Sequence, residues 1–501
     1  MRRPRLRLAL SCVLGLLARP SETRAALPGE GQEIHTNDYS IDLYQGPVLS
    51  ANRVTGLAGA FVAIADGVEG SAMNPAATAA RLPYSYGHFD YDVGVGITFP
   101  SAIKNTDFWN SGHRTELPKS KSLGFLFFNL ALQLQFGTWG LGLSTDFQQY
   151  SLLRGVDPTD NARRDRLAAQ IAIGHLQLAH SFADGQLLVG VGMRTTGLSV
   201  NKEGATSVAS QQELFSTVGL GFESGVIWQP TDWPIRFGAA YRGGFNTRAA
   251  PESTFVLYAD DPVNRLYLPT RVTLPWDVNV GFAAQIGPRP LNPRWIDPSI
   301  VLQPMRRYLE WRAHERERRL RIAEQSVFCE ETPLERRRRL RKLRVELAAE
   351  EDLDENERAR VEKDLVRRLR ERYHQLARFY VLVTTSLMIS GTVDNAVGIE
   401  SMIDRTVQRS GQRLSISPHL GIETEAIEHW LRVRGGSYLE PSRFDSNQKG
   451  SRLHATFGFD TKLFAWDVFG AWPPDAEWRF GASVDASRSY LSGGIAVGLW
   501  H

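Results

Sequence analysis

Long segments in which apolar and polar residues alternate strictly dominate this chain from about residue 83 onward. The clearest segment runs from Leu274 to Gly287. Its apolar positions are Trp276, Val278, Val280, Phe282, Ala284 and Ile286, and the positions between them are Asp277, Asn279, Gly281, Ala283 and Gln285. Alternation with a period of two predicts a β-strand that has one apolar face and one polar face. A fold made of many such strands must offer different environments on the two sides of its sheet.

About fourteen segments share this pattern, an even number such as bacterial membrane barrels require. They lie near residues 83–99, 121–136, 138–150, 167–183, 185–200, 212–229, 233–247, 274–287, 377–391, 413–425, 428–440, 451–466, 476–487 and 490–500. Most are about 12 to 17 residues long, whereas strands of soluble sheets usually have about 5 to 6. We therefore predict an all-β transmembrane barrel of about 14 antiparallel strands, with apolar faces toward lipid and polar faces toward the lumen.

Aromatic residues lie near the ends of these segments, where membrane barrels carry aromatic girdles. They are Tyr84, Trp139, Tyr150, Trp228, Trp233, Trp276, Trp430, Trp478 and Tyr490. On the opposite faces the alternation places charged groups inward, among them Arg236, Arg242, His454 and Asp460. The connections between segments are alternately short and long, and short connections face the periplasm in such barrels. The long connection over residues 288–376 takes the place of a short one, so we expect it on the periplasmic side.

The first residues have the order of a secretory signal peptide. Basic residues precede the apolar run Leu8 to Ala18, and small residues follow up to Ala26, which predicts cleavage after residue 25 or 26. Only Cys329 then remains of the two cysteines, so the exported chain cannot form an internal disulfide. Export and alternating strands together predict a protein of the bacterial outer membrane, in contact with its lipid.

A charged segment over residues 303–378 distorts the average composition. It holds about 22 of the 58 Lys and Arg residues and about 17 of the 55 Asp and Glu residues. Without it and the signal peptide the chain is acidic by about seven charges, so the pI of 8.8 does not indicate a nucleic-acid-binding protein. Thr332 to Glu335 forms a capping box with proline at the first helical position, and Asp354 to Glu357 repeats that spacing.

Leucine and valine stripes at helical spacing predict about three helices, near 304–328, 333–350 and 355–376, with the last two as an antiparallel pair. Such a segment is either a solvated helical hairpin without a partner or a docking arm for a periplasmic protein, peptidoglycan or a second copy of the chain. The candidate docking residues are Arg336, Arg337, Arg338 and Arg339. Runs of like charge are also common on solvated faces, so both interpretations stay open.

The segment between the signal peptide and the first strand is rich in small residues and does not alternate. Its run from Gly59 to Asp66 and its Asn74-Pro75-Ala76 turn resemble the N-terminal hatch of FadL-type outer-membrane transporters and their relatives, which include PorV-like barrels. The resemblance implies a hatch that plugs a fourteen-stranded barrel, in which hydrophobic molecules such as long-chain fatty acids bind before leaving sideways into the membrane. The candidate gate residues are Asn52, Arg53, Gly56, Gly59, Phe61, Asp66, Asn74 and Pro75.

Asp66 offers two alternatives: it pairs with an inward arginine such as Arg236, Arg242 or Arg432, or it caps a short helix of the hatch. The chain as a whole divides into a signal peptide (1–25), the hatch (26–82), strands one to eight (83–302), the charged helical insert (303–378) and strands nine to fourteen (379–501).

Two classes of function fit these features better than an enzyme. One is a channel for hydrophobic small molecules, and the other is a structural or secretion-associated barrel whose helices dock a partner. No Ser/His/Asp set, paired carboxylates, metal-ligand cluster or phosphate-binding loop stands out in the sequence, so we expect neither catalysis nor a cofactor.

Overall fold

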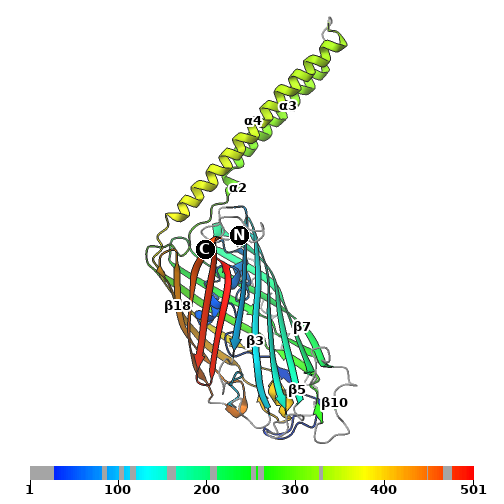
Figure 1. Cartoon of the computed structure of the whole chain (residues 1–501), viewed down its shortest axis with the longest axis vertical. Helices are drawn as coiled ribbons and strands as arrows, with labels where there is room; N and C mark the ends of the chain where they lie inside the picture. The colour runs from blue at the N-terminus through cyan, green and yellow to red at the C-terminus, as the bar shows by residue number, and fades with distance from the viewer. Residues whose placement is uncertain are drawn as a thin grey trace, which may run out of the picture.

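The strands close into one barrel (Figure 1). The computed structural model describes residues 27–81, 87–100, 107–112, 120–154, 165–203, 212–249, 256–257, 265–326, 331–447, 450–465 and 477–500. The predicted signal peptide, Tyr84 and Cys329 lie outside these residues. Fourteen antiparallel strands form the barrel, which closes where β21 pairs with β2. The predicted fold class and strand number are therefore confirmed.

The bounds of the barrel strands follow the alternating segments closely. They are β2 (Phe89–Pro100), β3 (Ser120–Phe136), β4 (Trp139–Arg154), β5 (Asp165–Phe182), β6 (Leu187–Glu203), β7 (Gln212–Trp228), β8 (Ile235–Arg242), β13 (Asp277–Ile286), β14 (Val381–Ser390), β17 (Ser415–Ile427), β18 (Leu431–Glu440), β19 (Arg452–Ala465), β20 (Glu477–Ser487) and β21 (Tyr490–Leu499). Closure pairs every strand on both sides, as a structure that spans lipid requires.

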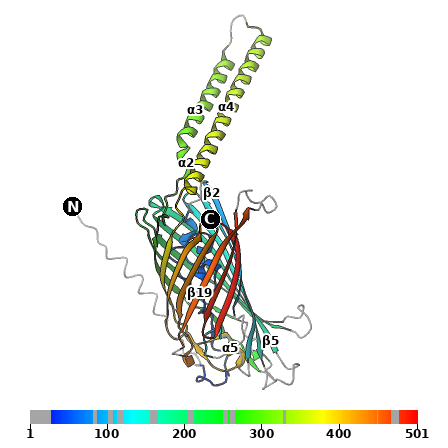
Figure 2. The same cartoon turned by 60° about the vertical axis from the view of Figure 1, so that its left-hand side comes forward.

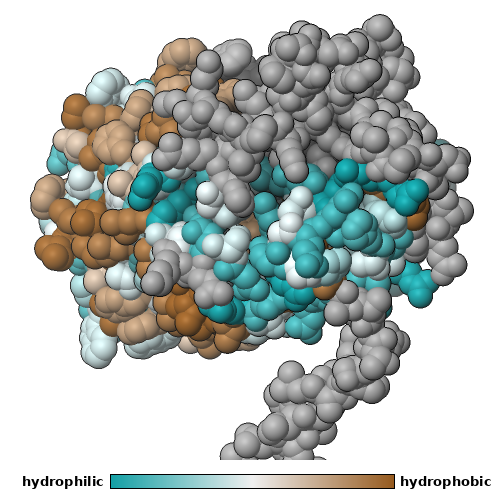
Figure 3. Space-filling view, turned by 90° about the horizontal axis from the view of Figure 1, so that it is seen from below, coloured by the Kyte–Doolittle hydropathy of each residue, from teal (hydrophilic) through white to brown (hydrophobic). Residues whose placement is uncertain are grey.

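The two faces of the wall have the predicted polarity. In β13, Asp277 and Asn279 are buried toward the lumen, whereas Val280 and Ile286 are exposed on the outside. Seen from the end opposite the helices, hydrophilic residues occupy the middle of the molecule and hydrophobic residues lie on its outer side (Figure 3). An apolar outer surface on a closed barrel of this kind is a lipid-facing surface.

The prediction that Tyr490 belongs to the aromatic girdle is wrong. Tyr490 is buried, with its ring 5.3 Å from that of His454 and tilted by 56° to it, and it lies under the guanidinium of Arg452. It begins β21 directly after a tight turn, so a one-residue difference in register decides which face it takes. Trp139, Trp233 and other predicted girdle residues are exposed on the outside.

A small sheet covers the end of the barrel opposite the helices, where the sequence predicted only loops at 248–273 and 392–412. Its strands, in spatial order, are β16 (Arg409–Ser410), β15 (Ala396–Val397), β1 (Ser40–Asp42), β12 (Arg271–Leu274) and β9 (Phe245–Arg248). We call it the cap sheet. Beside it lie the two-stranded ribbon β10 (Val256–Leu257) and β11 (Leu266–Tyr267), and helix α5 (Ile399–Asp404). Part of the predicted hatch, β1, is thus the central strand of the cap sheet.

After β1 the chain runs into the lumen, where residues 43–81 form what we call the plug. The plug contains α1 (Asn52–Gly56) and two short 3-10 helices, η2 (Val68–Gly70) and η3 (Pro75–Ala79). Its apolar side chains from Leu57 to Ala65 are fully buried. Small residues permit this, because their compact backbone fits between the inward-facing side chains of the wall. A fourteen-stranded barrel is too wide for those side chains alone to fill.

The charged segment forms a hairpin of two helices that projects from the barrel (Figures 1 and 2). After the short helix α2 (Pro298–Val301), α3 (Gln303–Gln325) and α4 (Pro333–His374) are the two arms. The predicted break near residue 354 is wrong, since α4 is continuous for 42 residues and pairs with α3. Asp354 does not cap a helix; its carboxylate accepts hydrogen bonds from Arg312 and Arg316 of α3.

The hairpin leaves the barrel between β13 and β14, at the end where the tight β3–β4, β5–β6 and β7–β8 turns lie. The alternation of short and long connections predicted that the hairpin lies at this end of the barrel. Among the helices that the structure describes, none has the length and apolar character needed to cross a membrane.

Candidate functional site

Glycines of the barrel wall make room for the plug. A Cβ atom placed on Gly140, Gly190 or Gly238 would lie 1.9 to 2.4 Å from plug backbone atoms of Thr78, Pro75 and Val62 respectively. Inward glycines therefore mark where the plug backbone touches the wall. Gly56 of the plug similarly lies against the wall, since a Cβ atom added to it would be 3.3 Å from the Cα of Gly458.

Asparagine side chains fix the plug to the wall by hydrogen bonds to backbone carbonyls. Asn74 donates to the carbonyl of Val62 at 2.9 Å and to that of Val226 at 3.2 Å, and its own oxygen caps η3, which begins with Pro75. Asn52 donates to the carbonyl of Gly481 at 3.1 Å. Buried polar groups that are fully bonded in this way hold a segment in one position.

Charged pairs join the plug to the wall on the side of the hairpin. Arg53 binds Glu423 of β17 through two nitrogens, at 2.9 and 2.8 Å, and packs over the ring of Phe61. Asp66 pairs with Arg236 of β8 at 2.5 Å. This partner is among the three arginines expected for Asp66, and the alternative role as a helix cap is excluded because Gly67 occupies the N-cap of η2.

These pairs continue into a network across the wall. Arg434 binds both Glu423 and Asp460, and Arg479 links Asp460 to Glu69 of the plug. A cavity of about 90 Å³ lies among these groups, which we call the charged cavity. Its lining of ionised side chains disfavours apolar molecules, because the charges would lose their hydration and gain nothing in return.

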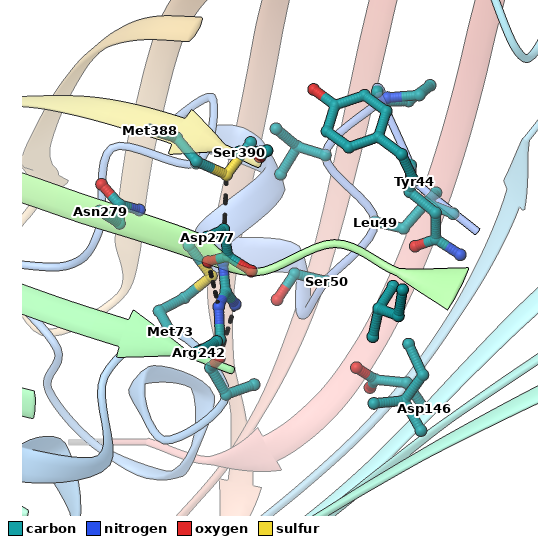
Figure 4. A pocket seen from close by; sticks show the side chains of 18 of the residues that line it. Tyr44, Leu49, Ser50, Met73, Asp146, Arg242, Asp277, Asn279, Met388 and Ser390 are labelled. Carbon is teal, nitrogen blue, oxygen red and sulfur yellow. Dashed lines mark hydrogen bonds and ion pairs between the residues drawn. The ribbon is translucent and has the colours of Figure 1, made fainter. Parts of the chain in front are cut away.

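A second cavity, of about 160 Å³, lies on the other side of the plug, beneath the cap sheet (Figure 4). We call it the cap cavity. Residues 43–50 of the plug, Gly59 and Met73 line it from within, and the barrel wall lines it from outside. Its apolar wall side chains include Phe127, Ile173 and Met388.

The cap cavity also has polar walls. Arg242 donates to Asp277 at 2.6 Å, and Figure 4 shows this pair on one side of the cavity, with Asp146 on the other. Arg194 lies 3.5 Å from the same Asp277, and His175 bonds Glu223 at 3.0 Å. The cavity therefore combines apolar surface with a few fixed hydrogen-bonding groups, the usual composition of a small-molecule site.

The structure brings together part of what the sequence singled out. Asn52, Arg53, Gly56, Asp66, Asn74 and Pro75 contact the wall, Phe61 is buried inside the plug, and Gly59, with a φ of 76°, is a lining residue of the cap cavity. Arg242, Asp277 and Asn279 were predicted to face inward, but nothing in the sequence indicated that the wall residues of that cavity lie together. Their only signal is an inward polar position on a strand, which Gln148 and Asn279 share with many others.

The four arginines proposed for docking divide into two pairs. Arg336 donates to the carbonyl of Glu324, and Arg339 binds Glu331 and the carbonyls of Ala323 and Ser326, so both arginines join the start of α4 to the end of α3. Cations at a helix C-terminus offset its partial negative charge. Arg337 and Arg338 are exposed.

A closed, lipid-facing barrel with a plugged lumen is the class of protein that this fold and site define. No family model matches the chain, and none of the curated proteins matches it in sequence. Among solved structures it is similar to the P. putida toluene transporter TodX, with 10% identity, 91% of this chain and 98% of that chain covered, and a TM-score of 0.46.

Two further solved structures are also similar. The Ralstonia pickettii toluene transporter TbuX has 11% identity, with 93% of this chain and 100% of that chain covered and a TM-score of 0.45. The CymD monoaromatic hydrocarbon channel has 10% identity, with 91% of this chain and 96% of that chain covered and a TM-score of 0.41. These are similarities of overall form, and the fold itself rests on the strand pairing described above.

Proposed function

We propose that this protein is an outer-membrane channel that admits small hydrophobic compounds. The cap cavity carries the proposal, since it lies inside a lipid-facing barrel between the cap sheet and the plug and has a mixed apolar and polar lining. A compound that enters from the cap side reaches this cavity before it meets the plug. The cavity is thus a binding site on the path of entry rather than an open pore.

Exit along the barrel axis is disfavoured by the charged network around Glu423 and Asp460. The wall offers another route beside the cavity. β8 pairs with β7 only from Glu223 opposite Arg242 to Trp228 opposite Phe237, and beyond Arg242 the chain turns inward as β9 and joins the cap sheet. We place the sideways exit at this short seam, where Val218 and Leu220 of β7 face outward.

Long-chain fatty acids, which the hatch resemblance implies as ligands, require a larger space than this conformation provides. An engineered apolar cavity of about 150 Å³ holds benzene, so about 160 Å³ accommodates one ring. A long acyl chain would bind only after the plug or the cap sheet moves.

The test replaces residues 52–76 with a flexible Gly/Ser segment of equal length, which leaves β1 in the cap sheet. We expect an assembled, heat-modifiable barrel with higher conductance in planar bilayers and altered uptake of hydrophobic compounds into liposomes. An assembled variant with unchanged conductance and uptake would show that the plug closes nothing, and the channel proposal would then be wrong.

A second candidate function is docking of a periplasmic protein or peptidoglycan by the hairpin. It is favoured by the stacked rings of Tyr308 and Trp311, 6.0 Å apart and both more than half exposed near the base of α3. Residues 303–378 would then be a separable unit. Replacement of these residues by a short turn should leave a stable barrel. If that shortened barrel failed to assemble, residues 303–378 would not be a unit separate from the barrel.

The hairpin has to lie in the periplasm for this role. Cys329, between α3 and α4 in the sequence, provides the probe, because it is the only cysteine after the predicted signal peptide. A membrane-impermeant thiol reagent should leave it unlabelled on intact cells and label it after disruption of the outer membrane. Labelling on intact cells would place the hairpin outside.

A further inference from the structure

The segment that joins the barrel to the hairpin crosses the mouth of the barrel. Residues 288–297, which we call the strap, connect β13 to α2 at the base of the hairpin (Figure 2). Arg289 binds Glu425 of β17 at 3.2 Å, and Arg294 binds Asp184 in the β5–β6 turn at 2.7 Å. In the strand order β17 lies two places from β13 on one side, and β6 lies three places away on the other. The strap therefore spans the opening between distant parts of the wall.

The strap packs directly on the plug. Leu291 is buried in one apolar cluster with Phe61 and Ile64 of the plug. Trp295 lies under the guanidinium of Arg81, at 4.4 Å, where the plug ends. These contacts bury apolar surface of both segments, so the strap and the plug stabilise each other's position.

One guanidinium holds the strap and the plug at once. Arg236 of β8 donates from Nε to Asn292 and from Nη2 to the carbonyl of Leu291, both at 2.7 Å. Its Nη1 donates to the carbonyl of Ile64 at 2.8 Å and to the carboxylate of Asp66 at 2.5 Å. The side chain of Arg236 is only 7% exposed, so water cannot readily replace a lost partner. Release of the strap therefore weakens the support that Arg236 gives to the plug.

The plug is held against β8, the strand that borders the proposed exit seam. A Cβ atom on Gly238 would lie 2.2 Å from the carbonyl oxygen of Val62, and Asn74 donates to the carbonyl of Ala239 at 3.5 Å. Plug backbone thus lies directly on this strand, beside the seam between β7 and β8. A plug that moves away from β8 frees the inner side of the seam.

The strap is weakly held at the rim, and space lies beneath it. Arg294 and Asp184 have side chains that are 61% and 70% exposed, and exposed pairs contribute little to stability. A pocket of about 760 Å³ lies between the strap, α2 and the end of the plug at Ala79 and Arg81. Protein interiors are close-packed, so a segment moves only where free volume adjoins it. The strap can therefore leave the rim, and the plug can shift, without any loss of strand pairing.

We infer that the hairpin controls the channel through the strap: displacement of the hairpin base lifts the strap from Arg236, and the plug then leaves β8. The inference rests on the proposed channel function. α2 transmits the displacement, because it begins at Pro298 directly after the strap and is capped by Asp297 of the strap itself. The docking and channel functions proposed above then act on one equilibrium, so a ligand that prefers the displaced hairpin favours the open channel.

The first test removes a strap contact and leaves the plug sequence unchanged. Asn292→Ala takes a buried acceptor from Arg236, so openings of the full-length protein in planar bilayers should become roughly 5- to 150-fold more frequent. Asn201→Ala is the matched control. Asn201 of β6 is similarly buried, at 9% against 7% for Asn292, but its side chain bonds to Ser199 of its own strand. The control should leave the opening frequency unchanged, and heat-modifiable migration checks that both variants have assembled.

A double variant tests whether strap and plug share Arg236. Asp66→Asn removes the plug partner of the same guanidinium and should also raise the opening frequency. N292A/D66N should open no more often than the stronger single variant, because both changes act through one residue. Effects that multiply would show that strap and plug are held independently and would overturn the inference. If Asn292→Ala does not assemble, Leu291→Ala removes the packing of the strap on the plug and should raise the opening frequency instead.

The second test applies force to the hairpin itself. A magnetic bead attached through biotin to Cys329, the only cysteine after the predicted signal peptide, pulls the hairpin away from a bilayer that holds the protein. Openings of the wild-type protein should become more frequent as the load rises. Asn292→Ala should respond less, because its strap is already detached from Arg236. A wild-type protein whose openings do not depend on the load would contradict the control by the hairpin.

The outcomes separate the inference from the proposed function. If Asn292→Ala opens no more often than wild type while replacement of residues 52–76 raises the conductance, the strap does not hold the plug and the channel proposal stands. If both changes leave the conductance unaltered, the plug closes nothing and the proposed function itself fails.

Discussion

The lumen and the hairpin use the same pairs of arginine and carboxylate in opposite surroundings. In the lumen, the side chains of Glu423 and Arg434 are fully buried and 3.1 Å apart. In the hairpin, Arg319 and Glu350 are 2.9 Å apart, but 42% and 32% of their side chains are exposed. The contacts have similar lengths, and the difference in burial decides what each pair contributes.

An exposed pair contributes about 0 to 1 kcal/mol, because water screens it and both side chains lose mobility. A buried pair gains little over apolar residues of the same shape, but loss of one partner leaves a buried charge and costs about 3 to 5 kcal/mol. Lumen pairs therefore specify where the plug lies. Exposed hairpin pairs contribute little to stability. The arms are also joined at Asp354, a buried position of α4 whose carboxylate binds Arg312 and Arg316 of α3.

The largest expected effect is that of Glu423→Gln. The substitution removes the carboxylate that Arg53 and Arg434 share, so the free energy of unfolding should fall by about 3 to 5 kcal/mol. Urea unfolding in lipid vesicles measures this value. Glu350→Gln in the hairpin is the control and should change it by less than about 1 kcal/mol. Equal effects of the two substitutions would show that buried lumen pairs and exposed hairpin pairs contribute alike to stability.

A smaller effect is expected for Gly190→Val, which tests the plug against the wall without changing charge. Its Cβ would lie 2.4 Å from the carbonyl carbon of Pro75, so the plug must move, at a cost of about 1 to 3 kcal/mol. Conductance should rise as the plug shifts. Gly493→Val places the same side chain where nothing lies within 4 Å and should leave conductance unchanged. A silent Gly190→Val would mean that the plug does not rest on this glycine.

The barrel could be predicted from the sequence because its strands are long and lie between lipid and lumen. That position imposes alternation on ten or more consecutive residues, as in β13. The cap sheet could not be predicted in this way. Its strands have two to four residues, too few to show a period, and β1 pairs in parallel with strands more than 200 residues away in the sequence.

The candidate site was predicted only where one local segment supplies it. The plug residues Arg53 and Asp66 were found because they stand in one unusual run. The cap-cavity residues Gln148, Arg194 and Asn279 come from three strands, and the register of the whole barrel brings them together. The continuous helix α4 was missed because Asp354 looks like a helix cap in sequence, whereas its partners lie on the other arm.

Asp354→Ala should have a moderate effect that is confined to the hairpin. Arg312 and Arg316 lose a shared, nearly buried acceptor but keep access to water, so we expect a local cost of roughly 1 kcal/mol. Amide hydrogen exchange should increase in the facing parts of α3 and α4, while barrel strands keep their protection. An increase that extends to barrel amides would show that the hairpin and the barrel unfold together.

The smallest expected effect is a pH dependence at the hairpin tip. Hydrogen bonds from Thr332 lower the pKa of Glu335, and a hydrogen bond from Arg339 lowers the pKa of Glu331. A carboxylate with a lowered pKa stabilises the folded state above its unfolded value, about 4.5, and loses that contribution as the pH falls through the folded value. Amide hydrogen exchange at the start of α4, corrected for intrinsic rates, should therefore increase as the pH falls from 6 to 3.5.

The double variant E331Q/E335Q, which cannot titrate at these positions, should show a smaller change. A wild-type tip with equal protection at both pH values would show that these contacts add nothing to the hairpin, and an equal change in the double variant would assign the pH dependence to other carboxylates.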